Sequence, residues 1–136
     1  MSDTKNLSIN LKMQKAKAMF AEVDVLMQNQ FYSTAINRLY YACFHATKAL
    51  LLTKDIIPKT HSGVIATLNK YFVVESSFNK EKSSFFSKLM KERSEGDYSD
   101  LILYDLETVR VLIQPAKEYI AYIESLILKH YNEHQQ

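Results

Sequence analysis

The sequence is poor in the residues that interrupt regular structure, since its 136 residues include only two glycines and two prolines. A sheet protein needs turn residues about every 8–12 positions, so this composition argues against an all-β fold. Cys43 is the single cysteine, which excludes an intramolecular disulfide and a cysteine-cluster zinc site and agrees with a reducing cytoplasm. We therefore expect a cytoplasmic protein made of long helices joined by few loops.

Long apolar runs and a strong net charge are also absent. No run approaches the ~18–20 apolar residues of a membrane helix, and the N-terminal stretch MSDTKNLSINLK lacks the apolar core of a secretion signal, so we expect no membrane association. A net charge of +2 does not by itself indicate nucleic-acid binding, and any anion site must be local. No histidine pair shows zinc-ligand spacing backed by carboxylates, and no glycine-rich phosphate loop occurs, so we expect neither a metal nor a cofactor.

Hydrophobic periodicity predicts helices along most of the chain. They span approximately residues 8–28, 31–52, 61–74, 80–95 and 105–131. Ser33 is a candidate N-cap for the second helix, and Thr60 or Ser62 for the third. Gly96 is expected to end the fourth helix, and Pro115 lies inside the last one, where it predicts a kink.

The second predicted helix is apolar around most of its circumference. Its first stripe consists of Ile36, Leu39, Tyr40, Cys43, Thr47 and Leu50. A second stripe carries Arg38 and His45 among alanines, so we expect this helix to be central in the bundle or covered by a second subunit. The whole chain, 1–136, is expected to form one all-α domain. We expect an antiparallel up-and-down bundle of four to five helices, with its core at about residues 12–130 and flexible ends.

Arg38 and His45 are the first candidates for chemistry. They are seven residues apart, which places them on one helix face about 10 Å from each other, with Tyr41 between them. Arginine offers a charged fork for a phosphate, and histidine exchanges a proton near neutral pH. These residue types suffice to cleave RNA through its own 2′-hydroxyl without a metal.

The alternative for Arg38 and His45 is a structural role. In both cases we expect them to be at least half buried, because the stripe around them is apolar. A buried arginine needs a carboxylate partner. The candidates are Asp97, Asp100, Asp105 and Glu107.

Two further stretches carry groups that bind anions. His61 lies at a predicted helix start, where exposed backbone amides favour anions; the alternative is an ordinary cap with an exposed imidazole. In KERSEGDYSD, Arg93 is followed by Asp97 and Tyr98. This stretch predicts either a salt bridge between Arg93 and Asp97 or an arginine and a phenol directed at one pocket.

Taken together, NRLYYACFHATKALL, KTHSGV and RSEGDY, in this order and spacing, resemble HEPN domains (higher eukaryotes and prokaryotes nucleotide-binding). The likeness is to the small stand-alone prokaryotic branch and covers about residues 12–130. It implies an all-helical bundle that is often dimeric. It also implies a gene commonly found beside a minimal nucleotidyltransferase, in a toxin–antitoxin-like pair.

Catalytic members of that family cleave RNA without a metal, using an arginine and a histidine separated by four to six residues from each subunit of a dimer. In those members the motif lies in the second half of the chain and a polar residue usually follows the arginine. Here Arg38 and His45 lie in the second helix, and Leu39 follows the arginine. At the later position, Arg93 is followed by four residues and then by Tyr98, which occupies the place of the motif's histidine.

The sequence thus leaves three functions open. The first is a dimeric, non-catalytic partner of a nucleotidyltransferase that binds nucleotide or RNA. Its candidate binding residues are Arg38, Tyr41, His61, Arg93, Asp97 and Tyr98. The second is a metal-independent endoribonuclease in which Arg38 holds the phosphate and His45 is the general acid or base. The third is a purely structural interaction protein.

Overall fold

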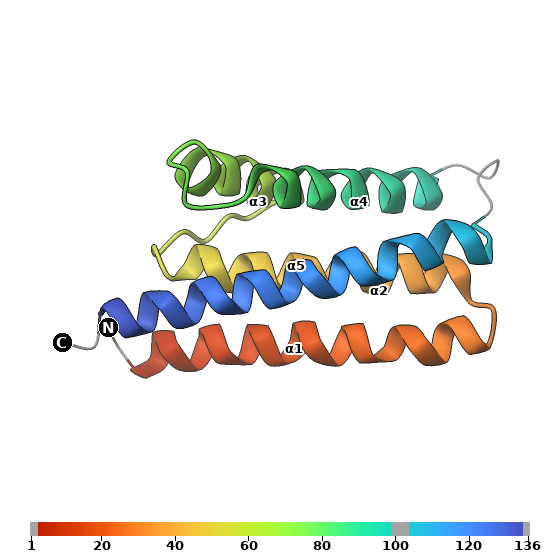
Figure 1. Cartoon of the computed structure of the whole chain (residues 1–136), viewed down its shortest axis with the longest axis horizontal. Helices are drawn as coiled ribbons and strands as arrows, with labels where there is room; N and C mark the ends of the chain where they lie inside the picture. The colour runs from red at the N-terminus through yellow and green to blue at the C-terminus, as the bar shows by residue number, and fades with distance from the viewer. Residues whose placement is uncertain (1–2, 99–103, 135–136) are drawn as a thin grey trace.

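The computed structural model describes residues 3–98 and 104–134, with side chains described for 3–94 and 104–134. Its helices are α1 (Asp3–Gln28), α2 (Tyr32–Leu52), α3 (His61–Leu68), the π-helix η1 (Asn69–Val73), α4 (Lys80–Tyr98) and α5 (Leu106–Glu133). No strand occurs among these residues. The long helices α1, α2, α4 and α5 alternate in direction (Figure 1), which confirms the predicted all-α up-and-down bundle.

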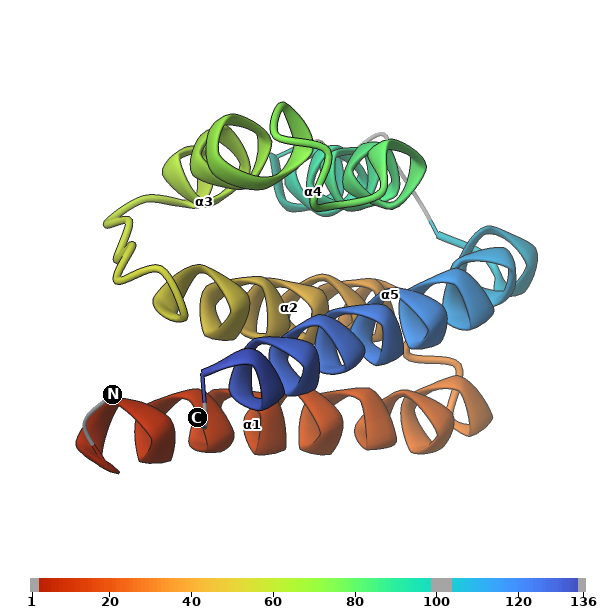
Figure 2. The same ribbon diagram turned by 60° about the vertical axis from the view of Figure 1, so that its left-hand side comes forward.

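Helix α2 is the centre of this bundle and packs against α1, α3, α4 and α5. The layer of α3 and α4 covers one side of α2, and α1 covers the opposite side (Figure 2). The alanines of α2 are fully buried by helices of the same chain: Ala35, Ala42, Ala46 and Ala49. Of the two alternatives for this helix, a central place within the bundle is therefore confirmed.

Three helices end in turns that usually contain glycine but here use other residues. Gln30, Asp55 and Ser76 have φ near +60°, the left-handed conformation that usually selects glycine. After α1, the Gln30 N–H donates to the Met27 carbonyl (3.1 Å) and the Phe31 N–H to the Leu26 carbonyl (2.9 Å). The same pair of bonds follows α2 and η1, and this Schellman pattern satisfies the last carbonyls of each helix.

Aromatic side chains join α2, α4 and α5 in the core. Tyr40, Phe86 and Tyr119 are completely buried, and the Phe86 ring packs on both tyrosines at centroid distances of 5.9 and 5.4 Å. The Tyr119 hydroxyl lies 2.6 Å from Oγ1 of Thr47, which in turn donates to the Cys43 carbonyl. Buried polar groups cost free energy unless they are paired, so this chain of bonds lets α5 bury a phenol against α2.

The helix ends correct two predictions and confirm another. Thr60 caps α3 by accepting from the Gly63 N–H (2.9 Å), as one of the two alternatives predicted. Ser33 is not an N-cap, because the tight turn at Gln30 starts α2 at Tyr32, so that Ser33 lies in its first turn. Gly96 does not end α4, which continues to Tyr98: glycine permits a helix to stop but costs only about 1 kcal/mol inside one.

Helix α5 begins after Asp105, whose carboxylate accepts from the Thr108 N–H at 2.8 Å. The helix continues through Pro115 to Glu133. In the described part of the chain, no helix combines the length and the apolar character needed to cross a bilayer.

Candidate anion-binding site

Arg38 forms an ion pair with Glu22 of α1, with 2.7 Å between Nε and Oε2. This corrects the predicted choice of partner. Asp105 is occupied as the cap of α5, Glu107 pairs with Arg110, and the side chains of Asp97 and Asp100 lie outside the described residues. The Arg38 side chain is 37% exposed and the Glu22 side chain 50%, so Arg38 is more than half buried, as predicted, but the pair is partly open to water. We therefore assign Arg38 a structural contact between α1 and α2.

Arg93 of α4 faces the tyrosine pair of α2. Its Nη2 donates to the Tyr41 hydroxyl at 3.2 Å. The guanidinium also lies over both rings, 5.5 Å from the Tyr40 centroid and 5.3 Å from the Tyr41 centroid. Cation–π contact and hydrogen bonding together orient a permanently charged group above the centre of α2.

His61 lies at the first position of α3, as predicted, and is packed against the same tyrosines. Its Nδ1 is 2.6 Å from the Tyr40 hydroxyl, and its ring stacks on Phe44 at 4.4 Å. Burial, followed by the nearby charges of Arg93 and Lys48, lowers the pKa of His61. Burial also raises the pKa of Tyr40, so its hydroxyl keeps its proton at neutral pH. The cap geometry of α3 and the buried phenol thus hold the imidazole in place.

His45 follows Tyr41 by one helical turn, at a ring distance of 6.2 Å, and is at least half buried, as predicted. Burial, then the charges of Lys15, Lys48 and Lys12, lower the pKa of His45 to about 4. The imidazole is therefore neutral at pH 7. A group with this pKa is a poor general acid at neutral pH and a weak general base.

Six nitrogen-bearing side chains from four helices gather on this side of α2, and we call them the basic cluster. Its members are Lys12, Lys15, His45, Lys48, His61 and Arg93. Burial and the charges of Lys48 and Lys15 also lower the pKa of Lys12, so the Lys12 ammonium lies close enough to the other two to feel their charges. Among the described residues, none of these three lysines forms an ion pair with a carboxylate.

The structure brings together some of the predicted residues but not all. Tyr41, His45, His61 and Arg93 meet at the basic cluster, whereas Arg38 is held by Glu22. Tyr98 ends α4 and Asp97 precedes it, but their side chains lie outside the described residues.

Sequence reasoning missed several participants. Tyr40 was assigned only to the core, and Phe44, Lys48, Lys12 and Lys15 were not singled out. Lys48 could have been found, because it lies three residues after His45 on the same helix face. Lys12 and Lys15 come from α1, and no spacing within the sequence connects them to His45.

The cluster offers cations and neutral imidazoles, and no carboxylate among the described side chains forms an ion pair with its lysines. This combination suits a phosphate-bearing ligand, because arginine and lysine bind phosphate and a neutral imidazole can accept or share a proton. No group of three or more His, Cys, Asp or Glu side chains within the described residues is arranged to hold a metal ion.

Comparison with known proteins places this chain in a family. A model described as "HEPN domain" matches residues 9–126. A "UPF0332 protein" of Thermotoga maritima is 35% identical over 114 residues, covering 84% of this chain and 86% of that protein. The chain therefore belongs to the HEPN family, and the resemblance stated from its motifs is confirmed.

Two relatives from Methanocaldococcus jannaschii carry the name "Putative toxin". One is 32% identical over 127 residues, covering 88% of this chain and 85% of that protein. The other is 41% identical over 75 residues, covering 55% of this chain and 56% of that protein.

Proposed function

We propose that this chain is a toxin-like HEPN module that binds the phosphates of single-stranded RNA or of a nucleotide at the basic cluster. It acts as a homodimer with a nucleotidyltransferase partner. The observation that carries the binding proposal is the convergence of Lys12, Lys15 and Lys48 around His45, without an ion-pair partner among the described residues. The names of the two Methanocaldococcus relatives support the toxin-like assignment.

The electrostatic repulsion within the basic cluster favours the binding of an anionic ligand. Three ammonium groups that lower the pKa of a lysine and a histidine repel one another, and this repulsion destabilises the folded chain. A bound phosphate would relieve it. Arg93 continues the same charge pattern onto α4, and the neutral imidazole of His61 lies beside it on α3, so the surface can contact more than one phosphate of a strand.

Tyr41 adds a surface for a base. It is partly exposed, and the Arg93 bond to its hydroxyl fixes its ring beside His45 and His61. Aromatic rings beside cations are the usual platform for unpaired bases, which stack on them regardless of sequence. Single-stranded RNA therefore fits the cluster better than a duplex, whose bases are already stacked.

Binding is tested by fluorescence anisotropy with a labelled single-stranded RNA over a series of salt concentrations. Lys15→Ala should weaken binding several-fold and reduce the salt dependence, because one phosphate contact is lost. Lys17→Ala is the matched control: it lies on the same helix but pairs with Glu124 of α5. Equal loss in both variants, or no binding by the unaltered protein, would refute the cluster as the site.

The partner and the dimer are tested separately. Co-expression with the product of the neighbouring gene, followed by purification through a tag on one chain, should retain a nucleotidyltransferase. Light scattering of the chain alone should give twice its mass of 15.8 kDa. A neighbouring gene of another kind with no retained partner would refute the pairing, and a monomer at all concentrations would refute the homodimer.

A second candidate function is a metal-independent endoribonuclease. One observation favours it: the neutral imidazole of His61 lies near the Arg93 guanidinium on one side and near the neutral imidazole of His45 on the other. Cleavage that persists in excess chelator, leaves cyclic phosphate ends and is lost in His45→Ala would support it. Equal cleavage by that variant would show that a contaminant is responsible.

A further inference from the structure

A pocket of about 480 Å³ lies between the end of α2, the segment after η1 and the C-terminal half of α5. None of the basic-cluster residues lines it. Its volume falls within the range of small-molecule sites, which is about 300–1,000 Å³. The pocket therefore has room for one small molecule rather than a length of polymer.

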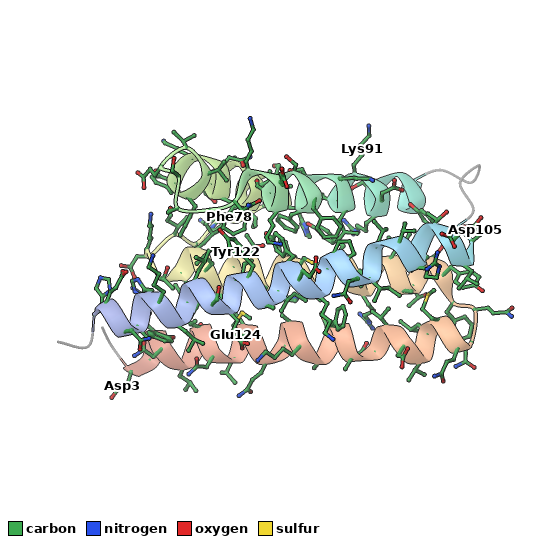
Figure 3. All side chains as sticks on the ribbon, in the orientation of Figure 1. Asp3, Phe78, Lys91, Asp105, Tyr122 and Glu124 are labelled. Carbon is green, nitrogen blue, oxygen red and sulfur yellow. The ribbon has the colours of Figure 1, made fainter. Side chains whose placement is uncertain are left out.

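The inner wall of the pocket is aromatic and apolar. Leu50, Phe72 and Phe78 are almost completely buried, and each lines the pocket. Phe78 lies edge-on to Tyr122 at 5.0 Å and 80°, and the two side chains sit next to each other between α5 and the segment before α4 (Figure 3). The Lys54 ammonium lies over the Phe72 ring at 4.2 Å from its centroid, so a flat ring placed here would meet Phe78 and Tyr122, and aromatic contacts of this kind have a directional preference.

The rim of the pocket is polar and carries charges of both signs. Lys54 and Lys129 supply two ammonium groups, against the single carboxylate of Glu133. Lys54 also donates to the Tyr71 carbonyl at 2.8 Å and pairs with Glu75 at 3.3 Å. Lys129 forms no ion pair with a described residue, so it is the cation best placed to take an anionic ligand.

From these features we propose that the pocket binds a small planar aromatic molecule that carries one anionic group. Its ring lies against Phe78 and Tyr122, and its carboxylate or phosphate meets Lys129. The site is separate from the basic cluster, so it gives the chain a place for a low-molecular-weight effector in addition to its RNA surface.

Isothermal titration of the full chain tests this proposal with two probes, 2-naphthoate and AMP, which distinguish a carboxylate from a phosphate. At least one should bind with 1:1 stoichiometry, whereas adenosine and inorganic phosphate, which each lack one half of the chemistry, should bind far more weakly. Lys129→Ala should weaken binding about tenfold, the usual size of one charge-assisted contact. Lys117→Ala, a lysine of α5 that does not line this pocket, should leave it unchanged.

Two further variants complete the test. Leu126→Trp should fill the pocket and abolish binding, provided that its melting temperature shows a folded chain; Leu126 is only partly buried and lines the pocket. Lys15→Ala should bind as the unaltered chain does, which separates this site from the RNA surface. Absence of 1:1 binding by both probes, or binding that survives Lys129→Ala and Leu126→Trp alike, would overturn the proposal.

Discussion

The hydroxyl of Tyr40, on the central helix α2, lies 2.6 Å from Nδ1 of His61, the first residue of α3. This contact joins the interior of the bundle to the candidate site, because Tyr40 is completely buried while His61 borders the basic cluster. The phenol keeps its proton and can donate it in the bond, which favours a neutral imidazole. The core of the protein thus sets the position and the charge state of a site residue.

Replacing Tyr40 by phenylalanine tests this contact. The ring packing is kept, but His61 loses its partner, so we expect a loss of about 1 kcal/mol in the free energy of unfolding and weaker RNA binding. Tyr119→Phe is the matched control, since it removes the bond to Thr47 in the core, away from the cluster. Denaturant unfolding and RNA anisotropy should show a similar stability loss in both variants but weaker binding only in Tyr40→Phe. Unchanged RNA binding in Tyr40→Phe would contradict this role.

Arg38→Ala should cost about 1 kcal/mol or less. Its ion pair with Glu22 is partly exposed on both sides, and such pairs contribute little in water. Thermal unfolding should show a small decrease in melting temperature, with Glu22→Gln behaving alike, and RNA binding should be kept. If Arg38→Ala keeps its melting temperature but loses RNA binding or cleavage, then Arg38 contacts the ligand and its structural assignment is wrong.

Acid should weaken the fold through His45. Its pKa is about 4 in the folded chain against an ordinary value of 6.5, so the unfolded chain binds more protons between these two pH values. The stability that this group contributes is fully present above about pH 6.5 and is lost as the pH falls towards 4. The loss is at most about 3 kcal/mol, and it is smaller here because the ring is partly exposed. Urea unfolding of His45→Gln should show a flatter dependence on pH over this window. If the free energy of unfolding depends on pH equally in His45→Gln and in the unaltered chain, then His45 does not have a lowered pKa in the folded chain.

Gln30→Gly should stabilise the chain. Gln30 holds φ at +61° in the turn between α1 and α2, a conformation that costs a residue with a side chain about 1–2 kcal/mol and glycine nothing. Part of the gain is offset by the freedom that glycine adds to the unfolded chain, so we expect a net increase of about 0.5–1 kcal/mol in chemical unfolding. Gln28→Gly, inside the last turn of α1, should have the opposite sign. Destabilisation by both variants would argue against the Schellman turn.

The sequence was sufficient for the helices because few residues interrupt them and their apolar periodicity is clear. Thr60 was predictable as a cap, since a threonine before a helix start offers an oxygen to the first amides. The turn before α2, with Gln30 in the left-handed region, was not predictable, because that conformation normally selects glycine. The prediction that Gly96 ends α4 was wrong, since the conformational freedom of glycine permits a turn without requiring one.

The site was less accessible to sequence reasoning. Spacing fixes which residues share a face of one helix, and this placed Arg38, Tyr41 and His45 correctly relative to one another. It does not say which neighbouring helix covers that face. Glu22 and Lys15 lie on α1, and only the packing of α1 on α2 brings one to Arg38 and the other to His45.

The most direct test of the basic cluster is an NMR titration of the His45 imidazole with and without RNA. The strand should carry 2′-O-methyl groups, so that it cannot be cleaved through its 2′-hydroxyls. In the free protein the pKa of His45 should be about 4. Burial lowers this pKa most, and the charges of Lys15, Lys48 and Lys12 lower it further. Because phosphates among these lysines would offset the charges, the bound strand should raise this pKa part of the way towards its ordinary value. A pKa of His45 that is the same with and without saturating RNA would contradict phosphate binding at the basic cluster.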